Sequence, residues 1–311
     1  MAEPIALLAL ALDAACGWPE GLYRRIGHPV GAFARLINGC EARWNGKSRR
    51  ETARHMLGVA TLLLLLLASG GTAFLLEQAA RALLGQWAWP LIALAAWPAL
   101  AQRSLHSHYR EVQTTLEQGN LPLARAAVGM IVGRDTAVLD ESGVARAAIE
   151  SLAESFCDGI VAPLFWLLVL GLPGVWAYKA VNTADSLIGH PEEPLRAFGW
   201  ASARADDLLN LLPARLSALL ICCAGMRGWR VLWRDHSRHA SPNAGWPEAA
   251  MAGALDVRLA GPIRYDSVLV PKPWIGDGGK ADCGAMQRGR VIYLRACALC
   301  WLLAGGVQWL L

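Results

Sequence analysis

Long apolar runs alternate along the chain with stretches rich in arginine and acidic residues. The clearest run is Met56–Leu76, which contains six consecutive leucines at Leu62–Leu67, and a helix needs about 20 such residues to cross a bilayer. Trp87–Ala101, Leu208–Ala224 and Val291–Leu311 are further apolar runs. Tryptophans rim the first of these, as is common at a membrane–water interface. The pattern predicts an all-α, multi-pass integral membrane protein.

The polar stretches between these runs predict cytoplasmic loops. Gly17–His55 is rich in arginine, and such loops stay on the cytoplasmic side of a membrane. Gln102–Glu154 is polar and helix-like, and we expect it on the same side. Pro262–Arg290 is loop-like, with several glycines and prolines. Pro4–Ala15 is apolar but short for a span, so we expect a retained first helix that dips into the membrane or lies on it.

One segment predicts a re-entrant helical hairpin. The apolar part Ile160–Leu170 is only about 11 residues long, too short to cross a hydrocarbon core. Gly171-Leu172-Pro173-Gly174 then interrupts any helix, and Val175–Leu187 is helix-like again. A hairpin would bring Asp158 and Asp185 to the same level on antiparallel arms. A single crossing would instead leave these two acids on opposite sides of the membrane.

Composition supports the membrane assignment. The 311 residues are 55% hydrophobic and only 17% charged, whereas soluble proteins carry about 25% charged residues. The net charge of +4 comes from scattered arginines, so a nucleic-acid partner is not expected. No linker or repeat divides the chain, and we expect a single domain over residues 1–311. The eight cysteines lie mostly in apolar runs and are interpreted as small hydrophobic residues rather than zinc ligands.

The stretch Ala203–Arg215 carries the densest polar pattern beside an apolar run. On a helix, Asp206 and Asn210 are four residues apart and Arg204 and Asp207 are three apart, so each pair shares a side. Ionisable groups at membrane depth usually face a cavity or one another. The alternative is an ordinary helix end with caps and surface ion pairs.

A glycine turn, Gly133-Arg134-Asp135-Thr136, is a second candidate. The arginine could bind a phosphate and the aspartate a magnesium ion, although the same residues also make an ordinary turn with a helix cap. The sequence contains neither a Walker loop nor a glycine-rich dinucleotide turn.

Three further polar groups interrupt the apolar pattern. Glu150, Glu154 and Asp158 recur every four residues, which stacks three acids on one helix face. Asn182-Thr183-x-Asp185-Ser186 could cap the start of a new helix. His239–Gly245 is a rigid loop with several hydrogen-bonding side chains. A Ser–His–Asp hydrolase is disfavoured because no Gly-x-Ser-x-Gly motif occurs, and the histidines lack the spacing of a transition-metal site.

Taken together, these groups supply carboxylates, which suit Mg²⁺, and arginines, which suit phosphate. This combination favours ATP-dependent chemistry at a membrane face over transport, because transporters more often show internal repeats. The acids are Asp135, Glu154, Asp158, Asp185, Asp206 and Asp207, the arginines are Arg134, Arg204 and Arg215, and the amides are Asn182, Asn210 and Asn243.

The order and spacing of these motifs, over nearly the whole chain, resemble the cobalamin biosynthesis family CobD/CbiB, the adenosylcobinamide-phosphate synthases. The resemblance rests on His28-Pro29-Val30, Gly133-Arg134-Asp135-Thr136, Glu154 with Asp158 and Pro163, Asn182-Thr183-x-Asp185-Ser186 with Gly189, Phe198-Gly199, Ala203–Arg215, and His239-x-Ser241-Pro242-Asn243-Ala244-Gly245 followed by Ala250–Leu255. Ser155 stands where the family usually has asparagine, Trp18 where an acid is common, and Asp256 where glycine is usual.

The resemblance implies a multi-pass protein of the cell inner (cytoplasmic) membrane. Its activity would be an ATP- and Mg²⁺-dependent amide ligase that joins adenosylcobyric acid to aminopropanol phosphate or aminopropanol. The bilayer is an implied partner, as is a second copy of the chain or another cobalamin-assembly enzyme. A non-catalytic AmpE-like regulatory protein and a corrinoid transporter are the alternatives.

Under this resemblance, the motif residues take distinct roles in one pocket at the inner leaflet. Four aspartates would act as catalytic groups that hold Mg²⁺, and His239 would take a proton from the attacking amine. The remaining residues would bind ATP and orient the substrates. The aspartates are Asp158, Asp185, Asp206 and Asp207, and the binding residues are Arg134, Asp135, Thr136, Asn182, Thr183, Arg204, Asn210, Arg215, Ser241 and Asn243.

Overall fold

The structure is a computed structural model that describes every residue except 1–2, 47, 134, 266–267, 271 and 311. The chain forms two compact units, each built from separate parts of the sequence. Unit 1 comprises Met1–Ala101, Ala162–Asn210 and Ala304–Leu311, and unit 2 comprises Gln102–Val161 and Leu211–Leu303. The expectation of one domain over residues 1–311 stays a prediction.

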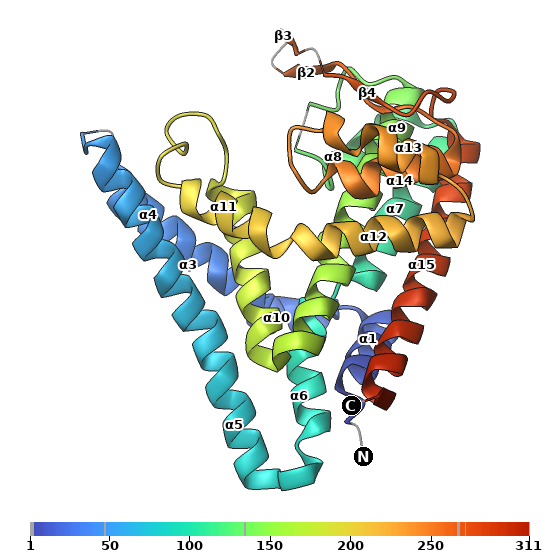
Figure 1. Ribbon diagram of the computed structural model, residues 1–311. Coiled ribbons are helices and arrows are strands. Elements are labelled where there is room, and N and C mark those ends of the chain that lie inside the picture. Colours follow the sequence, from blue (N-terminus) through green and yellow to red (C-terminus); the bar gives the residue numbers. More distant parts are fainter. Residues whose placement is uncertain (1–2, 47, 134, 266–267, 271, 311) are drawn as a thin grey trace. The chain divides into compact units, whose positions relative to one another are not determined.

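Every regular element among the described residues of unit 1 is a helix (Figure 1). Its elements are α1 Ile5–Cys16, α2 Glu20–Ile26, α3 Pro29–Trp44, α4 Glu51–Leu66, η1 Leu67–Gly71, α5 Thr72–Leu84, η2 Gly85–Trp87, α6 Trp89–Ala96, η3 Trp97–Ala99, α10 Ala162–Ile188 and α11 Trp200–Leu209. A histidine caps the start of α3. There the Val30 N–H donates to His28 Nδ1 at 3.2 Å, and Pro29 occupies the first turn, where its missing N–H costs nothing.

The core of unit 1 lies between α3, α4 and the second half of α10. Ile37 and Leu65 are fully buried there, together with Ala180 and Phe198. Small residues on α10 let the three helices approach closely, which is typical of helix packing in membrane proteins.

The predicted break in the hairpin segment is confirmed at Gly171. This residue has φ +66° and ψ −153° inside α10, a backbone conformation that favours glycine. The N–H of Leu172, freed from the helical pattern, donates to Glu77 Oε2 at 3.0 Å, and Glu77 in turn pairs with Arg81 at 3.0 Å. Re-entry of this segment into a membrane stays a prediction.

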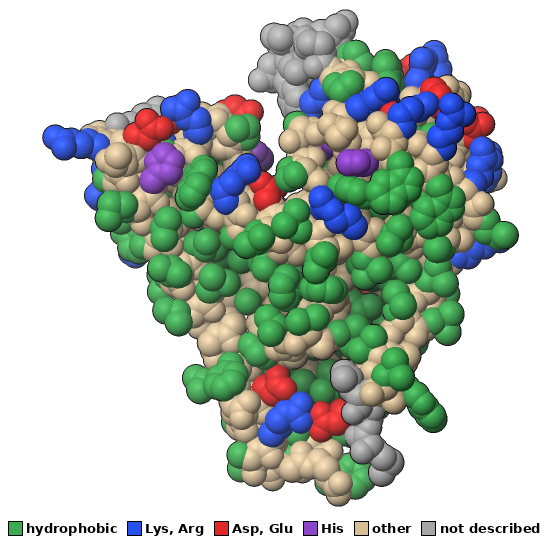
Figure 2. All heavy atoms as spheres, in the orientation of Figure 1, with side chains coloured by type: hydrophobic (Ala, Val, Ile, Leu, Met, Phe, Trp, Pro, Cys, Tyr) green, Lys and Arg blue, Asp and Glu red, His purple; other side chains and the backbone are tan. Residues whose placement is uncertain are grey.

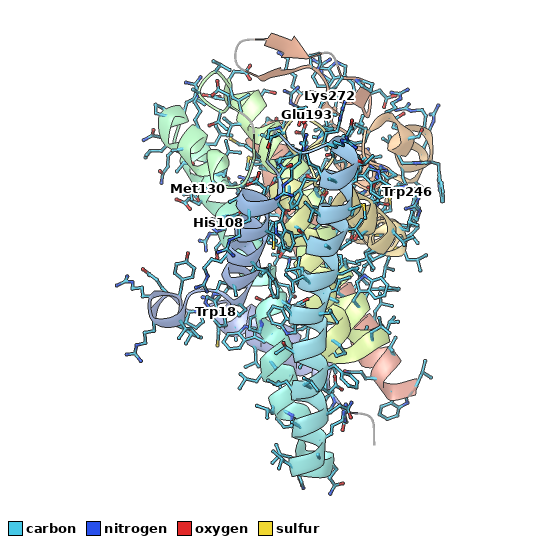
Figure 3. The ribbon with its side chains drawn as sticks, turned by 90° about the vertical axis from the view of Figure 1, so that its left-hand side faces the viewer. Trp18, His108, Met130, Glu193, Trp246 and Lys272 are labelled. Atoms are coloured by element: carbon cyan, nitrogen blue, oxygen red, sulfur yellow. The ribbon has the colours of Figure 1, made fainter. Side chains whose placement is uncertain are left out.

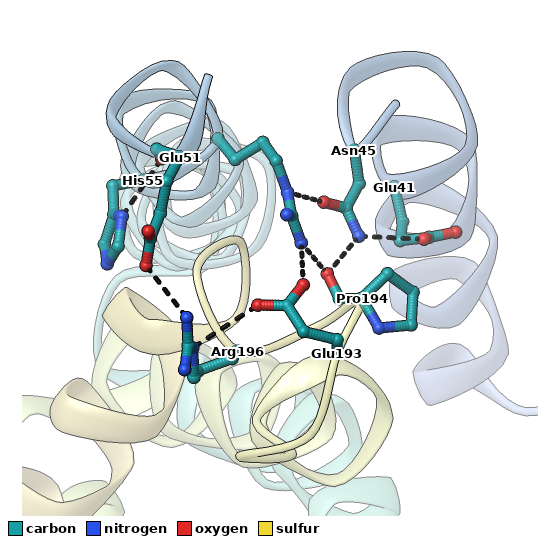
Figure 4. Close-up of polar contacts among 8 residues, drawn as sticks. Glu41, Asn45, Glu51, His55, Glu193, Pro194 and Arg196 are labelled. Atoms are coloured by element: carbon teal, nitrogen blue, oxygen red, sulfur yellow. Dashed lines mark hydrogen bonds and ion pairs between the residues drawn. The ribbon is translucent and has the colours of Figure 1, made fainter. Parts of the chain in front are cut away.

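The loop after α10 is held to α3 and α4 by a buried arginine (Figure 4). Arg54 Nε donates to Asn45 Oδ1 at 2.8 Å, its Nη2 donates to Glu193 Oε2 at 2.9 Å, and it also reaches the Pro194 carbonyl. The same loop closes on itself, because a Cβ at Gly199 would lie 1.6 Å from the Ile188 carbonyl oxygen. Glycine is therefore required there, and the start of α11 is fixed beside the end of α10.

Unit 2 is helical with two short pairs of antiparallel strands. Its elements are α7 Gln102–Glu117, α8 Leu121–Gly129, α9 Glu141–Phe156, η4 Cys157–Val161, α12 Leu211–Gly225, α13 Trp229–Asp235, η5 His236–Arg238, α14 Gly245–Leu255, β1 Leu259–Ala260, β2 Ile263–Tyr265, β3 Val268–Val270, β4 Trp274–Ile275 and α15 Cys283–Leu310. Strand β1 pairs with β4, and β2 pairs with β3. Helix α14 is buried over nearly its whole length and packs against α12 and α13.

Side-chain caps define the helix starts in unit 2. Asp140 accepts from the Gly143 N–H at 2.7 Å at the start of α9, and Asn120 accepts from the Leu123 N–H at 3.2 Å at the start of α8. Both residue types are favoured at this position because they satisfy a backbone donor that the helix leaves unpaired.

The structure contains apolar helices that are long enough to cross a membrane. The prediction of a membrane protein is confirmed to that extent, by helix length and composition. Within the described residues three helical stretches qualify, namely Glu51–Trp87, Glu141–Ile188 and Cys283–Leu310, or up to five if each of two bent pairs counts as one span. Figure 2 shows many hydrophobic side chains on the surface. In the stretch Glu51–Trp87 they include Leu67 of η1 and Leu75 of α5, which are 72% and 68% exposed. Such exposure suits lipid as the surrounding solvent.

Several element predictions were wrong in detail. The expected loop Gly17–His55 consists mostly of helices, and the expected loop Pro262–Arg290 holds three strands and the start of α15. Asn182–Ser186 does not cap a new helix but lies within α10, which continues to Ile188. Asp158 does not continue the helical face of Glu150 and Glu154, because it falls in the π-helical segment η4, where the register shifts.

Candidate functional site

A buried carboxylate organises the predicted site residues of unit 1, and we call its surroundings the Asp206 cluster (Asp206, Asn210, Asn182 and Tyr178). Asp206 Oδ2 accepts from Asn210 Nδ2 at 3.0 Å, and Asp206 Oδ1 accepts from Asn182 Nδ2 at 3.3 Å. The Tyr178 hydroxyl donates to Asn210 Oδ1 at 3.1 Å. The spacing of Asp206 and Asn210 on one helix side is thus confirmed. One amide of the cluster, Asn182, lies in α10, and the other, Asn210, is the C-cap of α11.

Charged groups border the Asp206 cluster on both helices. Arg204 Nη1 lies 2.9 Å from Asp207 Oδ2, with the arginine side chain 61% exposed and the aspartate 23% exposed. Lys179, on α10, acts electrostatically on the Asp206 carboxylate and on the His28 imidazole. Two cations, Arg204 and Lys179, therefore lie around the cluster, and such side chains can bind an anionic substrate group.

Two further predicted residues, Thr183 and Asp185, lie near the end of α10. The Thr183 hydroxyl donates to the Lys179 carbonyl at 2.6 Å. The carboxylate of Asp185 folds over Gly189, where a Cβ would lie 1.9 Å from Asp185 Oδ1. Thr183 and Asp185 therefore lie on the same helix as Asn182, one to three residues further along.

An arginine on α12 organises the predicted residues of unit 2, and we call its surroundings the Arg215 cluster (Arg215, Asn243, Trp246 and His236). Arg215 Nη1 donates to Asn243 Oδ1 at 3.1 Å and to the Leu211 carbonyl at 2.7 Å. Its guanidinium carbon lies 4.6 Å from the centroid of the Trp246 ring, and the His236 ring stacks on Trp246 at 4.0 Å. Trp246 is labelled in Figure 3. A guanidinium held in this way is oriented before any ligand binds.

Ser241 and His239 shape the loop that carries Asn243. Ser241 Oγ accepts from the N–H groups of Asn243 and Ala244, both at 3.2 Å. The Ser241 N–H donates to His239 Nδ1 at 3.0 Å, so the neutral imidazole carries its proton on Nε2, which lies 3.8 Å from Glu248 Oε1.

Burial and, secondarily, the charge of Lys272 lower the pKa of His239, which keeps the ring neutral near pH 7. The nitrogen that could accept a proton, Nδ1, is engaged by Ser241. The role of His239 as a base stays a prediction, and it requires the Ser241 hydrogen bond to open.

Asp235 fixes the start of this loop. It is fully buried, pairs with Arg234 at 2.7 Å and Arg238 at 3.2 Å, and accepts from the Gly276 N–H at 2.8 Å. The hydrogen bonds from Arg234 are the largest cause of a pKa that lies below the ordinary range of an aspartate.

This lowered pKa predicts a pH-dependent stability. A carboxylate whose pKa is lowered by folding stabilises the protein above its unfolded pKa of about 3.9, and the contribution is lost as the pH falls through the folded value. Asp235→Asn should cost roughly 2 kcal/mol near pH 7, and its Tm difference from the wild type should shrink below about pH 5. The measurement is thermal unfolding against pH, with the exposed Asp256→Asn as control. A difference that stays constant down to pH 3 would contradict the assignment.

The other predicted residues of unit 2 are not members of the Arg215 cluster. Asp135 is exposed and its Oδ1 accepts from the Ala137 N–H at 2.9 Å, which closes a local turn, and its role in binding stays a prediction. Thr136 follows in the same turn, and Arg134 lies outside the described residues. Asp158 is half-buried in η4, which packs against α12 and α7.

The described residues contain no group of three or more His, Cys, Asp or Glu side chains arranged to hold a metal ion. Magnesium, however, is commonly bound by one or two carboxylates, with water and substrate phosphates completing the shell. In unit 1, the half-buried Asp207 next to Asp206 fits this binding of magnesium by one or two carboxylates. The roles of Asp158, Asp185, Asp206 and Asp207 as ligands and the convergence of all motifs on one pocket stay predictions.

Sequence reasoning missed two residues for which a signal was present. Lys179 is a lone cation in the otherwise apolar run Val175–Val181, and such a residue in a membrane helix is usually functional. Glu248 is similarly a lone carboxylate in an apolar helix, is only 5% exposed, and faces His239.

The fold is that of an α-helical protein with three to five helices long and apolar enough to cross a membrane among its described residues, and it carries two polar clusters. The chain matches the family described as CobD/Cbib protein over residues 6–293. It therefore belongs to this family.

Named relatives cover nearly the whole chain. The cobalamin biosynthesis protein CobD of Rhodobacter capsulatus is 49% identical over 309 residues, which are 96% of this chain and 95% of the relative. The protein of the same name from Sinorhizobium sp is 48% identical over 313 residues, 96% and 97% of the two chains. That of Geobacter metallireducens is 43% identical over 315 residues, 97% and 96% of the two chains. No solved structure matches the chain.

Proposed function

We propose that this protein acts in cobalamin biosynthesis as an ATP-dependent amide ligase. It would join the carboxylate of adenosylcobyric acid to the amine of aminopropanol phosphate, or of aminopropanol, and form adenosylcobinamide phosphate or adenosylcobinamide. The observation that carries the proposal is the Asp206 cluster, in a chain that belongs to the CobD/Cbib family. A buried carboxylate that orients two amides supplies the preformed polar groups that such a reaction requires.

The chemistry explains why phosphate-binding groups are needed. A carboxylate is a poor electrophile, because its negative charge repels a nucleophile and oxide is a poor leaving group. Transfer of the terminal phosphoryl group of ATP to the carboxylate gives an acyl phosphate and ADP. The amine then attacks the acyl carbon, inorganic phosphate leaves, and the amine proton passes to a base. Cationic side chains lower the barrier by stabilising the negative charge that the phosphates carry.

In the proposed reaction the Asp206 cluster orients the acyl acceptor. Asp206 holds the Asn182 and Asn210 side chains in fixed rotamers, so that their remaining polar atoms present a preformed set of hydrogen-bonding partners. Lys179 and Arg204 would neutralise the substrate carboxylate or a phosphate. Asp207 would hold Mg²⁺, which shields phosphate charge when it is bound.

The Arg215 cluster would bind phosphate through the guanidinium atoms that Asn243 does not engage. Stacking on Trp246 and the bond to Asn243 fix the plane of the guanidinium, which lowers the entropy lost on binding. His239 would take up the amine proton after its bond to Ser241 opens.

A growth experiment tests the proposed step. Deletion of the gene should create a corrinoid requirement that added cobinamide relieves and added cobyric acid does not, because the proposed reaction lies between these two compounds. Complementation with the wild-type gene is the control. Growth of the deletion strain on cobyric acid would contradict the proposed reaction. Restoration of growth on cobyric acid by an Asp206→Asn gene would contradict the role of the Asp206 cluster.

A further inference from the structure

A group of cations on α7 and α15 of unit 2 has no part in the proposed reaction. It consists of His106, Arg110 and Arg290, and we call it the His106 cluster. His106 Nε2 and Arg290 Nε are both buried and have no hydrogen-bond partner within the described residues. The described residues provide no ion pair within 4.0 Å to Arg110 or Arg290, and the carboxylate that acts electrostatically on Arg290 is Glu117 of α7. Buried donors are nearly always satisfied in native proteins, so two orphans side by side call for a ligand.

Two tyrosines fix these side chains at the same level of the two helices. The Tyr109 hydroxyl of α7 donates to the Met286 carbonyl of α15 at 3.1 Å, and the Tyr293 hydroxyl donates back to the Gln102 carbonyl at 2.7 Å. The helices therefore run antiparallel here, which places His106 opposite Arg290. The His106 ring also stacks on Tyr293 at 6.4 Å. His108, labelled in Figure 3, follows on the same helix.

The electrostatics of the cluster favour an anion. Burial lowers the pKa of His106 most, and the charges of Arg290, Arg110 and Arg103 lower it further. The imidazole is therefore neutral near pH 7. Glu117 offsets part of the positive charge at Arg290, and no carboxylate belongs to the cluster itself. An anion that accepts from both buried donors would satisfy them and offset the repulsion between the arginines.

The position of Arg290 on α15 indicates what kind of anion fits. This helix is a candidate membrane span, and its exposed residues change from polar at Gln287 and Arg288 to apolar at Val291 and Leu294, with one further exposed cation at Arg295. Leu294 lies one turn beyond Arg290 on the same side. The cluster thus lies where a phospholipid would place its phosphate, with an acyl chain along the apolar side of α15.

We propose that the His106 cluster binds the headgroup phosphate of an anionic phospholipid. Arg110 and Arg290 bind the phosphate oxygens, His106 Nε2 donates to them, and Leu294 contacts the acyl chain. The bound lipid would link α7 to the first membrane-facing turns of α15.

The full-length protein in phospholipid nanodiscs provides the test. Retained lipid is measured by native mass spectrometry, and Tm is measured in nanodiscs of phosphatidylcholine alone and of phosphatidylcholine with phosphatidylglycerol. The wild type should retain phosphatidylglycerol and gain Tm from it. The double variant Arg110→Gln/Arg290→Gln should bind this lipid roughly 30-fold more weakly. In phosphatidylcholine alone its Tm should equal or exceed that of the wild type, because two like charges are removed.

The matched control is Arg49→Gln/Arg50→Gln, which removes the same charge from two exposed arginines before the candidate span Glu51–Trp87. It should keep the phosphatidylglycerol gain of the wild type. If both double variants lost the phosphatidylglycerol gain equally, the lipid would be attracted by surface charge in general, and the proposal would be overturned. An equal gain of Tm from added inorganic phosphate would overturn the assignment to a lipid. Undiminished phosphatidylglycerol retention by Arg110→Gln/Arg290→Gln would exclude the site altogether.

Discussion

Replacing Asp206 by asparagine is expected to lower kcat/KM for amide formation at least roughly 100-fold. The carboxylate accepts one hydrogen bond from Asn210 and one from Asn182, at 3.0 and 3.3 Å. An asparagine side chain has only one acceptor atom, and its amino group would face the amino group of one partner. One of the two amides must then turn away, and the preformed arrangement is lost.

The effect should fall on catalysis rather than on folding. Asp206→Asn removes a buried charge without changing side-chain volume, so its Tm should stay within a few degrees of the wild type. Glu192→Gln, in the exposed loop after α10, is the matched control and should leave kcat/KM unchanged. Near-wild-type turnover by Asp206→Asn, measured with purified protein in nanodiscs, would exclude Asp206 from the role proposed.

Replacing Arg215 by lysine should lower kcat/KM for ATP roughly 30-fold, mainly through a higher KM. Lysine keeps the charge but cannot lie flat on Trp246, where the guanidinium now stacks at 4.6 Å, while one of its N–H groups binds Asn243 at 3.1 Å. The phosphate-binding cation would then be flexible and more strongly hydrated.

Initial rates at varied ATP concentration separate this effect from a loss of stability. Arg227→Lys, at an arginine whose side chain is 58% exposed in the same unit, should leave KM unchanged. A similar rise of KM in both variants, or no rise in Arg215→Lys, would show that Arg215 does not contact the nucleotide.

Hydrophobic periodicity predicted the helical class well, because a chain surrounded by lipid must satisfy its backbone within helices. The Gly171 break and the Asp206–Asn210 pair followed from residue type and spacing alone. The spacing also predicted the ion pair of Arg204 with Asp207.

Other features depend on contacts that are distant in sequence. Asn182 meets Asp206 only because the Gly189–Gly199 loop returns the chain to the end of α10, and a pattern of residue types does not encode that return. The π-helical segment at Cys157–Val161 displaces Asp158 from the face that a period of four predicted. Arginine density alone suggested a loop where α2 and α3 form, since surface arginines are equally compatible with helices.

The most direct test of the account is the stoichiometry of the reaction by the purified full-length protein. Adenosylcobyric acid, aminopropanol phosphate, ATP and Mg²⁺ are supplied, and ADP, phosphate and the corrinoid amide are measured together. The account predicts one ADP and one phosphate for each amide formed, and no amide without ATP. Amide formation that is independent of ATP, or ATP hydrolysis without any amide, would contradict it.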